Sequence, residues 1–169
     1  MIDRVWKDGD RIALDLPMEI EVRTWAKQNG GVSVSRGPLS YALKIGEKWV
    51  KYGPSDAASA ESGGTDEWPE REVLPTTPWN YGLVLDAKNP AASFKLGNTQ
   101  PVKAQPFTLG DAPIELRAKA RRVPGWGLEL NCPADVPKSP VATSEPVEDV
   151  TLIPMGCARL RISVFPVVE

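Results

Sequence analysis

Residues 150–166 read VTLIPMGCARLRISVFP, and this stretch gives the clearest indication of the fold. Its second half alternates aliphatic with polar residues, pairing Leu160, Ile162 and Val164 with Arg159, Arg161 and Ser163. A period of two is typical of a strand with one buried and one wet face. The pattern already begins at Val150, and Pro154–Gly156 interrupts it. The stretch therefore predicts a strand, a turn and a second strand, with the three aliphatic residues in the core. The two arginines would be available to the surface or to a neighbouring domain.

Similar alternation recurs along the chain, at residues 11–16, 19–24 and 114–120. No segment shows sustained helical spacing, and 17 prolines divide the sequence into short pieces. Proline is excluded from helix interiors and central strands, so this composition favours many short strands. The sequence predicts an all-β fold, a β-sandwich of short, mostly antiparallel strands.

The length of 169 residues indicates one domain, covering residues 1–169. A domain of this size buries roughly 70% of its unfolded surface, so it needs no disulfide to hold a core. Residues 54–66 are small and polar, which predicts a mobile loop. Residues 133–146 hold four prolines and predict a long connection.

The charge pattern argues against two classes of partner. The formal net charge is −2, from 20 basic and 22 acidic residues, without the basic footprint of a nucleic-acid binder. No apolar run approaches the roughly 20 residues of a membrane helix. The first ten residues, MIDRVWKDGD, lack the apolar region of a signal peptide. We expect neither nucleic acid nor membrane as a partner, and localisation stays open.

The chain contains no histidine. Histidine general bases, Ser-His or Cys-His nucleophile pairs and histidine metal sites are therefore excluded within it. Cys132 and Cys157 lie 25 positions apart and form no CxxC motif. They are buried thiols, a disulfide, or part of a site completed elsewhere, and we favour buried thiols because free cysteine is commonly buried.

Two acidic groups are candidates for chemistry. Asp8 and Asp10 flank Gly9, as in a calcium loop, but the further acidic ligands of an EF-hand are missing and a hairpin turn is favoured. An acidic run, consisting of Asp66, Glu67, Glu70 and Glu72, surrounds Trp68. Paired carboxylates are what a glycoside hydrolase requires, whereas a solvated acidic loop is the simpler interpretation.

Aromatic and basic residues form two further sets of candidates. Indole and phenol faces at the surface of a sandwich suit the CH faces of sugar rings, which makes carbohydrate-binding candidates of Trp68, Trp79, Tyr81 and Trp126. Core packing or an interface is the favoured alternative for all four. A basic strand face that suits an acidic partner, or simply faces solvent, comprises Arg117, Lys119, Arg121 and Arg122.

Several segments together resemble one family. They are WKDGDRIALDLPMEIEVR at 6–23, GVSVSRGPLSYAL at 31–43, PWNYGLVLD at 78–86 and the closing VTLIPMGCARLRISVFP. The chain is similar to the C-terminal β-sandwich region of glycoside hydrolase family 127, the β-L-arabinofuranosidase-like enzymes. Met155 departs from the family, which often has an aromatic residue there.

The resemblance implies a non-catalytic role. In that family a glutamate and a zinc-held cysteine cluster act in an (α/α)6 barrel that precedes this region, so no catalytic residue and no zinc ligand is carried over. Cys157 matches a cysteine of the closing motif and is not a zinc ligand. The resemblance implies a chain without cofactor that braces the catalytic barrel of a parent glycosidase or forms a domain or subunit interface. The parent would be cytoplasmic, periplasmic or secreted.

Two alternatives stay open. The first is a carbohydrate-binding module that recognises plant-type oligosaccharides through surface tryptophans, and it requires those side chains to be exposed on one face. The second is a free-standing hydrolase that uses the acidic run, and it requires two carboxylates about 5 to 9.5 Å apart in a cleft.

Overall fold

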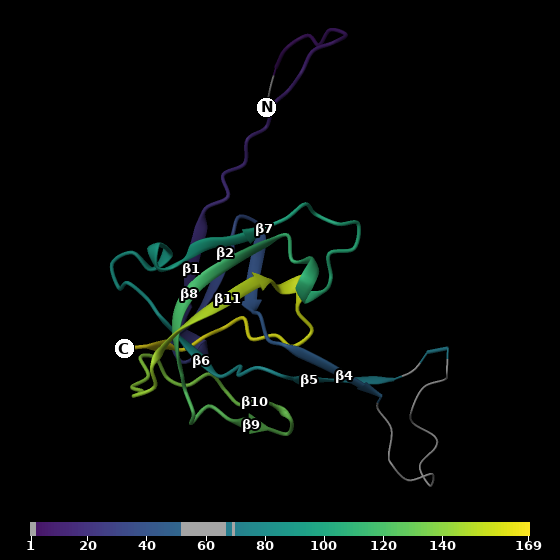
Figure 1. The fold of residues 1–169 in the computed structure, drawn as a ribbon. Helices are drawn as coiled ribbons and strands as arrows, with labels where there is room; N and C mark the ends of the chain where they lie inside the picture. The colour runs from purple at the N-terminus through teal and green to yellow at the C-terminus, as the bar shows by residue number, and fades with distance from the viewer. Residues whose placement is uncertain (1–2, 52–66, 69) are drawn as a thin grey trace.

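The computed structural model describes residues 3–51, 67–68 and 70–169 (Figure 1). The predicted loop at 54–66 lies outside these residues. Helical structure in the described part is limited to short 3-10 segments, namely η1 (Ala26–Gln28), η3 (Pro90–Ser93), η4 (Leu109–Asp111) and η5 (Met155–Cys157). No helix in these ranges is long and apolar enough to cross a membrane.

Strands make up the rest of the regular structure. In chain order they are β1 (Ile20–Trp25), β2 (Gly31–Arg36), β3 (Leu39–Leu43), β4 (Glu47–Lys51), β5 (Arg71–Pro75), β6 (Tyr81–Val84), β7 (Lys95–Thr99), β8 (Ile114–Arg122), β9 (Leu128–Glu129), β10 (Cys132–Pro133), β11 (Val147–Pro154) and β12 (Val167–Val168). Pro90 is the first residue of η3, where its fixed φ suits the start of a helical turn. The predicted all-β fold is confirmed.

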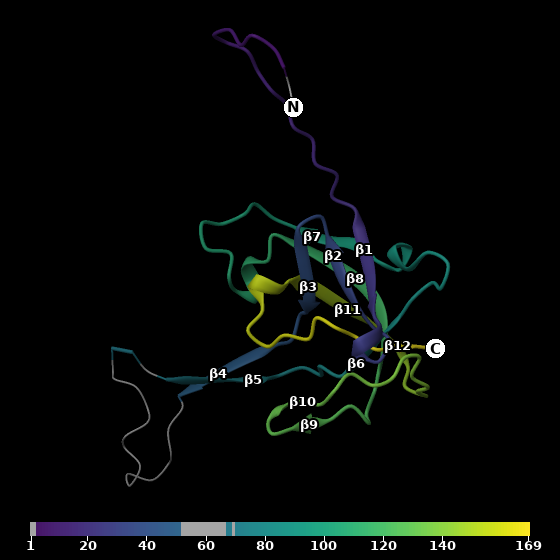
Figure 2. The same ribbon diagram turned by 180° about the vertical axis from the view of Figure 1, so that it is seen from behind.

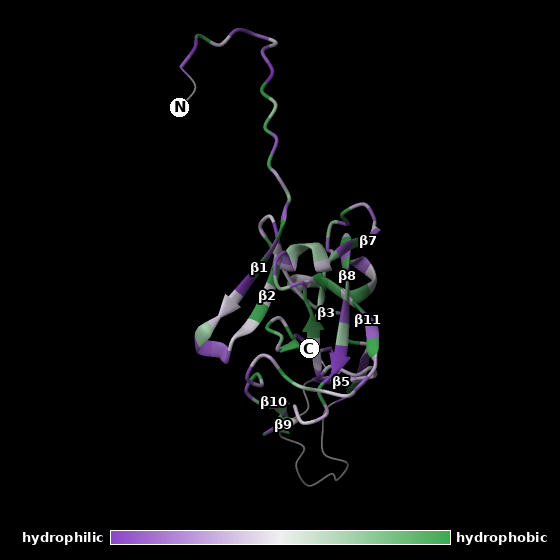
Figure 3. Ribbon diagram, turned by 90° about the vertical axis from the view of Figure 1, so that its left-hand side faces the viewer, coloured by the Kyte–Doolittle hydropathy of each residue, from purple (hydrophilic) through white to green (hydrophobic). Residues whose placement is uncertain are grey.

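Eight strands form one sheet in the order β1-β2-β3-β11-β8-β6-β12, with β7 also paired to β8. All pairs are antiparallel except β6 with β12. Seen edge-on in Figure 3, β1 and β2 lie on one side of the domain and β8 and β11 on the other. The main core lies between them and includes buried side chains of β2, β3, β6, β8 and β11. Two separate hairpins, β4–β5 and β9–β10, complete the strands.

Strand β11 joins the two halves of the sheet. Leu152 pairs with Leu43 of β3 on one edge and with Leu116 of β8 on the other. All three side chains belong to the main core, and Leu152 and Leu116 are fully buried. The next residue, Ile153, points to the opposite face and is fully buried in a second, smaller cluster with Cys157. Both faces of β11 are therefore covered.

The closing stretch is only partly as predicted. The first strand is β11 and the turn is η5, as expected. The second strand is wrong: residues 159–164 form no strand, although Ile162 is buried and Leu160 and Val164 are half-buried. Both edges of β11 are already paired, so the returning chain cannot join it. It contacts β3 and β2 instead: Leu43 N donates to Ile162 O at 2.8 Å, and Phe165 forms a bridge with Val32.

A glycine in β6, Gly82, allows the last residues of the chain to pair with that strand. A side chain at Gly82 would collide with Val168 of β12 and would lie 3.2 Å from the Pro166 carbonyl. Glycine lets the two backbones approach and form the parallel β6–β12 pair. Leu83 N donates to Pro166 O at 2.9 Å. Residues 166–168 are thereby held against the sheet.

The N-terminal arm, residues 3–19, extends away from the sheet (Figures 1 and 2). The predicted strand at 11–16 is wrong, because these residues have no strand partner in the described part of the chain. Their aliphatic side chains are exposed: Ile12 by 64%, Leu14 by 79% and Leu16 by 65%. The turn predicted at Asp8-Gly9 is present, and the Asp10 carboxylate accepts hydrogen bonds from Lys7 N and the Arg4 guanidinium.

Tyr81 illustrates how a buried polar group is satisfied. Its ring is buried, and its hydroxyl donates a 2.8 Å hydrogen bond to the Glu148 carboxylate on β11. Burial, together with this hydrogen bond, raises the pKa of Tyr81 to about 12. The phenol therefore stays protonated in the folded protein over a wider pH range than in the unfolded chain.

Shortening Leu152 to alanine is expected to destabilise the fold by about 2 to 5 kcal/mol, because the side chain is fully buried at the junction of the sheet. Val147→Ala, on the same strand but 44% exposed, is the control and should cost less than about 0.5 kcal/mol. Urea unfolding measures both. Equal losses of free energy in the two variants would contradict the role assigned to Leu152.

Stability is expected to fall at alkaline pH because of Tyr81. The folded pKa of about 12 lies above the ordinary value near 10, so the phenol's contribution is complete below pH 10 and is lost as the pH rises through 12. Urea midpoints between pH 8 and pH 12 measure this slope. In Tyr81→Phe the slope should be shallower, and an unchanged slope would contradict the assignment.

Candidate functional site

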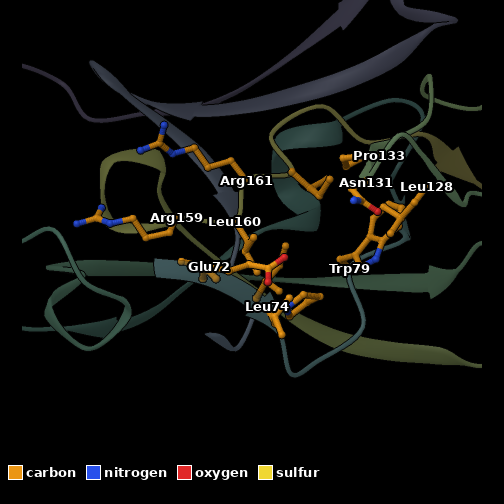
Figure 4. Close-up of a pocket in the computed structure, with 13 residues that line it drawn as sticks. Glu72, Leu74, Trp79, Leu128, Asn131, Pro133, Arg159, Leu160 and Arg161 are labelled. Carbon is orange, nitrogen blue, oxygen red and sulfur yellow. The ribbon is translucent and has the colours of Figure 1, made fainter. Parts of the chain in front are cut away.

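A cavity of about 330 Å³ lies between the two separate hairpins and the closing segment. Its walls come from β5, from Ile45 and Trp79, from the β9–β10 hairpin and from residues 159–162. Figure 4 shows Trp79, Leu128 and Asn131 together on one side, and Glu72 and Leu74 nearer the middle of the view. The cavity therefore has an apolar wall that carries a few polar groups, which is typical of small-molecule sites.

The four predicted aromatic residues are not gathered on one face. Trp126 is only 3% exposed and its indole donates to the Ala134 carbonyl at 2.9 Å. Tyr81 is also buried, so these two residues pack in the core and the expectation that they contact a sugar at the surface is wrong for them. Trp68 is 76% exposed. Trp79 is half-buried and lines the cavity.

Trp79 is positioned by Trp126. The two rings are 5.3 Å apart between centroids and meet edge to face at 70°. Such aromatic pairs contribute about 0.5 to 1.5 kcal/mol beyond the area they bury. Asn80, the next residue along, donates to the carbonyls of Val123 and Trp126. The indole of Trp79 is therefore held in place at the cavity wall.

Two exposed polar side chains at the cavity have no partner in the part of the chain that the structure describes. They are the carboxylate of Glu72 on β5 and the amide of Asn131 in the β9–β10 turn. Asn131 has φ 62° and Leu130 before it has φ 49°, the left-handed pair of a two-residue hairpin turn. Such a conformation is uncommon for leucine.

Arg159 and Arg161 line the other side of the cavity. Arg159 N donates to the Glu47 carboxylate, and Arg161 Nε donates to the Ala158 carbonyl. In Figure 4 both guanidinium groups lie away from Trp79. Both residues are exposed, as the sequence predicts, and they place positive charge at one end of the cavity.

The acidic run is only partly described. Asp66 lies outside the described residues, Glu67 and Glu70 are exposed, and Glu72 lines the cavity. In the described ranges no three histidine, cysteine or acidic side chains are grouped to hold a metal. Three of the four basic candidates donate hydrogen bonds within the chain: Lys119 to Asp149, Arg121 to Glu145 and Arg122 to Asn80. Arg117 is exposed.

The two cysteines occupy different environments. Cys157 is buried and donates from Sγ to the Pro106 carbonyl at 2.9 Å. Burial, and the nearby Asp111 carboxylate, raise the pKa of its thiol. Cys132 on β10 is exposed, so the expectation of a buried thiol is wrong there. The β9–β10 hairpin is separate from the main sheet, and the residues of both its strands are exposed. Both thiols are free.

Comparison with protein-family models, curated proteins and solved structures found no match to this chain. The similarity to glycoside hydrolase family 127 therefore stays a prediction from the sequence motifs.

Sequence reasoning selected Trp79 but missed most of its surroundings. Glu72 was grouped with its acidic neighbours, and Asn131 was not singled out. The sequence does hold one signal for a turn at Asn131, because asparagine tolerates the left-handed conformation of a tight turn. Leu130 and Asn131 adopt that conformation between two short extended pieces. Nothing in the local sequence places that turn beside Trp79.

The two thiols are expected to react at different rates with a thiol reagent such as dithionitrobenzoate. The folded protein should give one equivalent, from Cys132, and the protein in denaturant should give two. Only the thiolate form of a cysteine attacks the reagent. The Cys157 thiol reacts slowly because it is buried and because its raised pKa makes it less often deprotonated. Cys132→Ser should remove the fast reaction, and its persistence in that variant would contradict this assignment.

Proposed function

We propose that this chain is a non-catalytic β-sandwich domain that braces the catalytic barrel of a family 127-like glycoside hydrolase. The observation that carries the proposal is the N-terminal arm. Ile12, Leu14 and Leu16 alternate as in a half-buried strand, yet they are exposed in the described structure. Exposed apolar side chains in a regular pattern are typical of a surface that another domain covers.

The chemistry of the arm supports a domain contact. Burying one such aliphatic side chain contributes about 1.5 to 3 kcal/mol, so three on one face provide a substantial interface. The opposite face carries Arg11 and Asp15, which suits solvent. An extended segment of this kind pairs with a strand edge or fills a groove between helices.

The residues available for catalysis are consistent with a bracing role. The sequence has no histidine. Glu72 lines the cavity, whereas Glu67 and Glu70, which precede it in the acidic run, do not. The proposal therefore assigns hydrolysis, and the zinc-held cysteine cluster that serves it, to the barrel of the parent protein.

Hydrogen exchange tests the proposed contact. Amides of residues 11–16 should exchange freely in the 169-residue chain and should be protected at least about 100-fold in the full-length parent protein. The reading frame that contains this chain should encode a helical barrel. Equal exchange in both proteins, or a frame without a barrel, would contradict the proposal, as would zinc-dependent hydrolysis of arabinofuranosides by this chain alone.

Matched variants of the arm separate its two faces. A triple variant of the apolar face, with Ile12→Ser, Leu14→Ser and Leu16→Ser, should leave the unfolding free energy of this chain within about 0.5 kcal/mol, because the side chains are exposed. In the full-length protein it should abolish the protection of the arm. The control triple of the other face, with Arg11→Ser, Ala13→Ser and Asp15→Ser, should preserve it.

A further inference from the structure

The cavity beside Trp79 has the size and composition of a binding site for a small ligand. Its volume of about 330 Å³ lies at the lower end of the range for such sites. It is lined by segments that lie far apart in the sequence, from Ile45 to Ile162. A ligand there would contact both hairpins and the closing segment at once.

The wall of the cavity offers a flat aromatic surface framed by aliphatic side chains. Trp79 supplies the indole, and Leu74, Leu128 and Leu160 lie around the cavity. Leu128 and Leu74 are exposed, by 56% and 38%, so apolar surface remains uncovered at the rim. An apolar ligand face that packs on an indole would cover that surface.

Two polar groups of complementary chemistry line the cavity, Glu72 from β5 and Asn131 from the β9–β10 turn. The Glu72 carboxylate only accepts hydrogen bonds, whereas the Asn131 amide both donates and accepts. Neither has a hydrogen-bond partner among the residues described. Of two neighbouring hydroxyl groups on a ring, one can donate to the Glu72 carboxylate and the other can hydrogen bond with the Asn131 amide.

The Asn131 side chain is carried on a tightly defined turn. Leu130 and Asn131 both adopt the left-handed region, and Leu130 is fully exposed, so its own side chain gains no packing there. Non-glycine residues in this conformation are enriched at ligand-binding sites. The turn places Asn131 at the cavity that Trp79 also lines.

We propose that this cavity binds one or two sugar units of an oligosaccharide, with one ring packed on Trp79 and ring hydroxyls bonded to Glu72 and Asn131. A purely apolar ligand would leave the carboxylate buried without a partner, which is costly. This inference is independent of the bracing role, because the arm contributes no residue to the cavity.

Titration followed on the indole N–H signal of Trp79 tests the site. The probes are neutral arabino-oligosaccharides and acidic oligogalacturonides, each added to about 10 mM, since weak sites bind in the millimolar range. A saturable shift of the Trp79 signal with either probe is expected. A preference for the acidic probe would assign Arg159 and Arg161 to its carboxylates, and a preference for the neutral probe would leave them outside the contact.

Paired variants identify the contact residues. Trp79→Ala and Glu72→Gln should each weaken binding at least about tenfold. Their controls, Trp49→Ala and Glu70→Gln, lie outside the cavity and should change the affinity less than about twofold. Glu72 is exposed, so Glu72→Gln keeps the fold even if Trp79→Ala disturbs Trp126. Absence of a saturable shift with both probes, or unchanged affinity in Glu72→Gln, would overturn the proposal.

Discussion

The position of β11 between β3 and β8 is the constraint on which the rest of the structure depends. Leu152 pairs with one strand on each side and is buried between the two layers. Burial of Ile153 on the opposite face leaves β11 no free surface around this point. A strand with both edges paired and both faces covered accepts no further neighbour, so every later segment must be placed elsewhere.

The route of the chain after η5 follows from this constraint. Residues 159–164 leave β11 and hydrogen bond to β3 through Ile162, and residues 166–168 then reach β6 beside Gly82. On the way, residues 159–162 form one wall of the cavity, opposite the β4–β5 and β9–β10 hairpins. The cavity is thus a consequence of how the closing segment crosses the sheet, and its polar groups come from hairpins that the main sheet does not include.

The two proposals concern separate parts of the molecule. The arm presents a row of aliphatic side chains that nothing in the described residues covers, and this suits contact with a catalytic barrel. The cavity presents Trp79 with a carboxylate and an amide, and this suits a hydroxylated ring. A domain that braces a glycosidase and also holds part of its substrate would combine the two roles, although each depends on different residues.

The sequence by itself determined the all-β class and located β1, β8 and β11, because alternation records which side chains face a core. It did not determine which alternating segments find partners. Residues 11–16 and 159–164 have the same pattern as true strands, but strand pairing depends on distant edges that are free, and local periodicity carries no information about them. Only the tertiary structure decided that Trp126 is buried while Trp79 lines a cavity with Glu72 and Asn131, because burial depends on contacts between segments far apart in the chain.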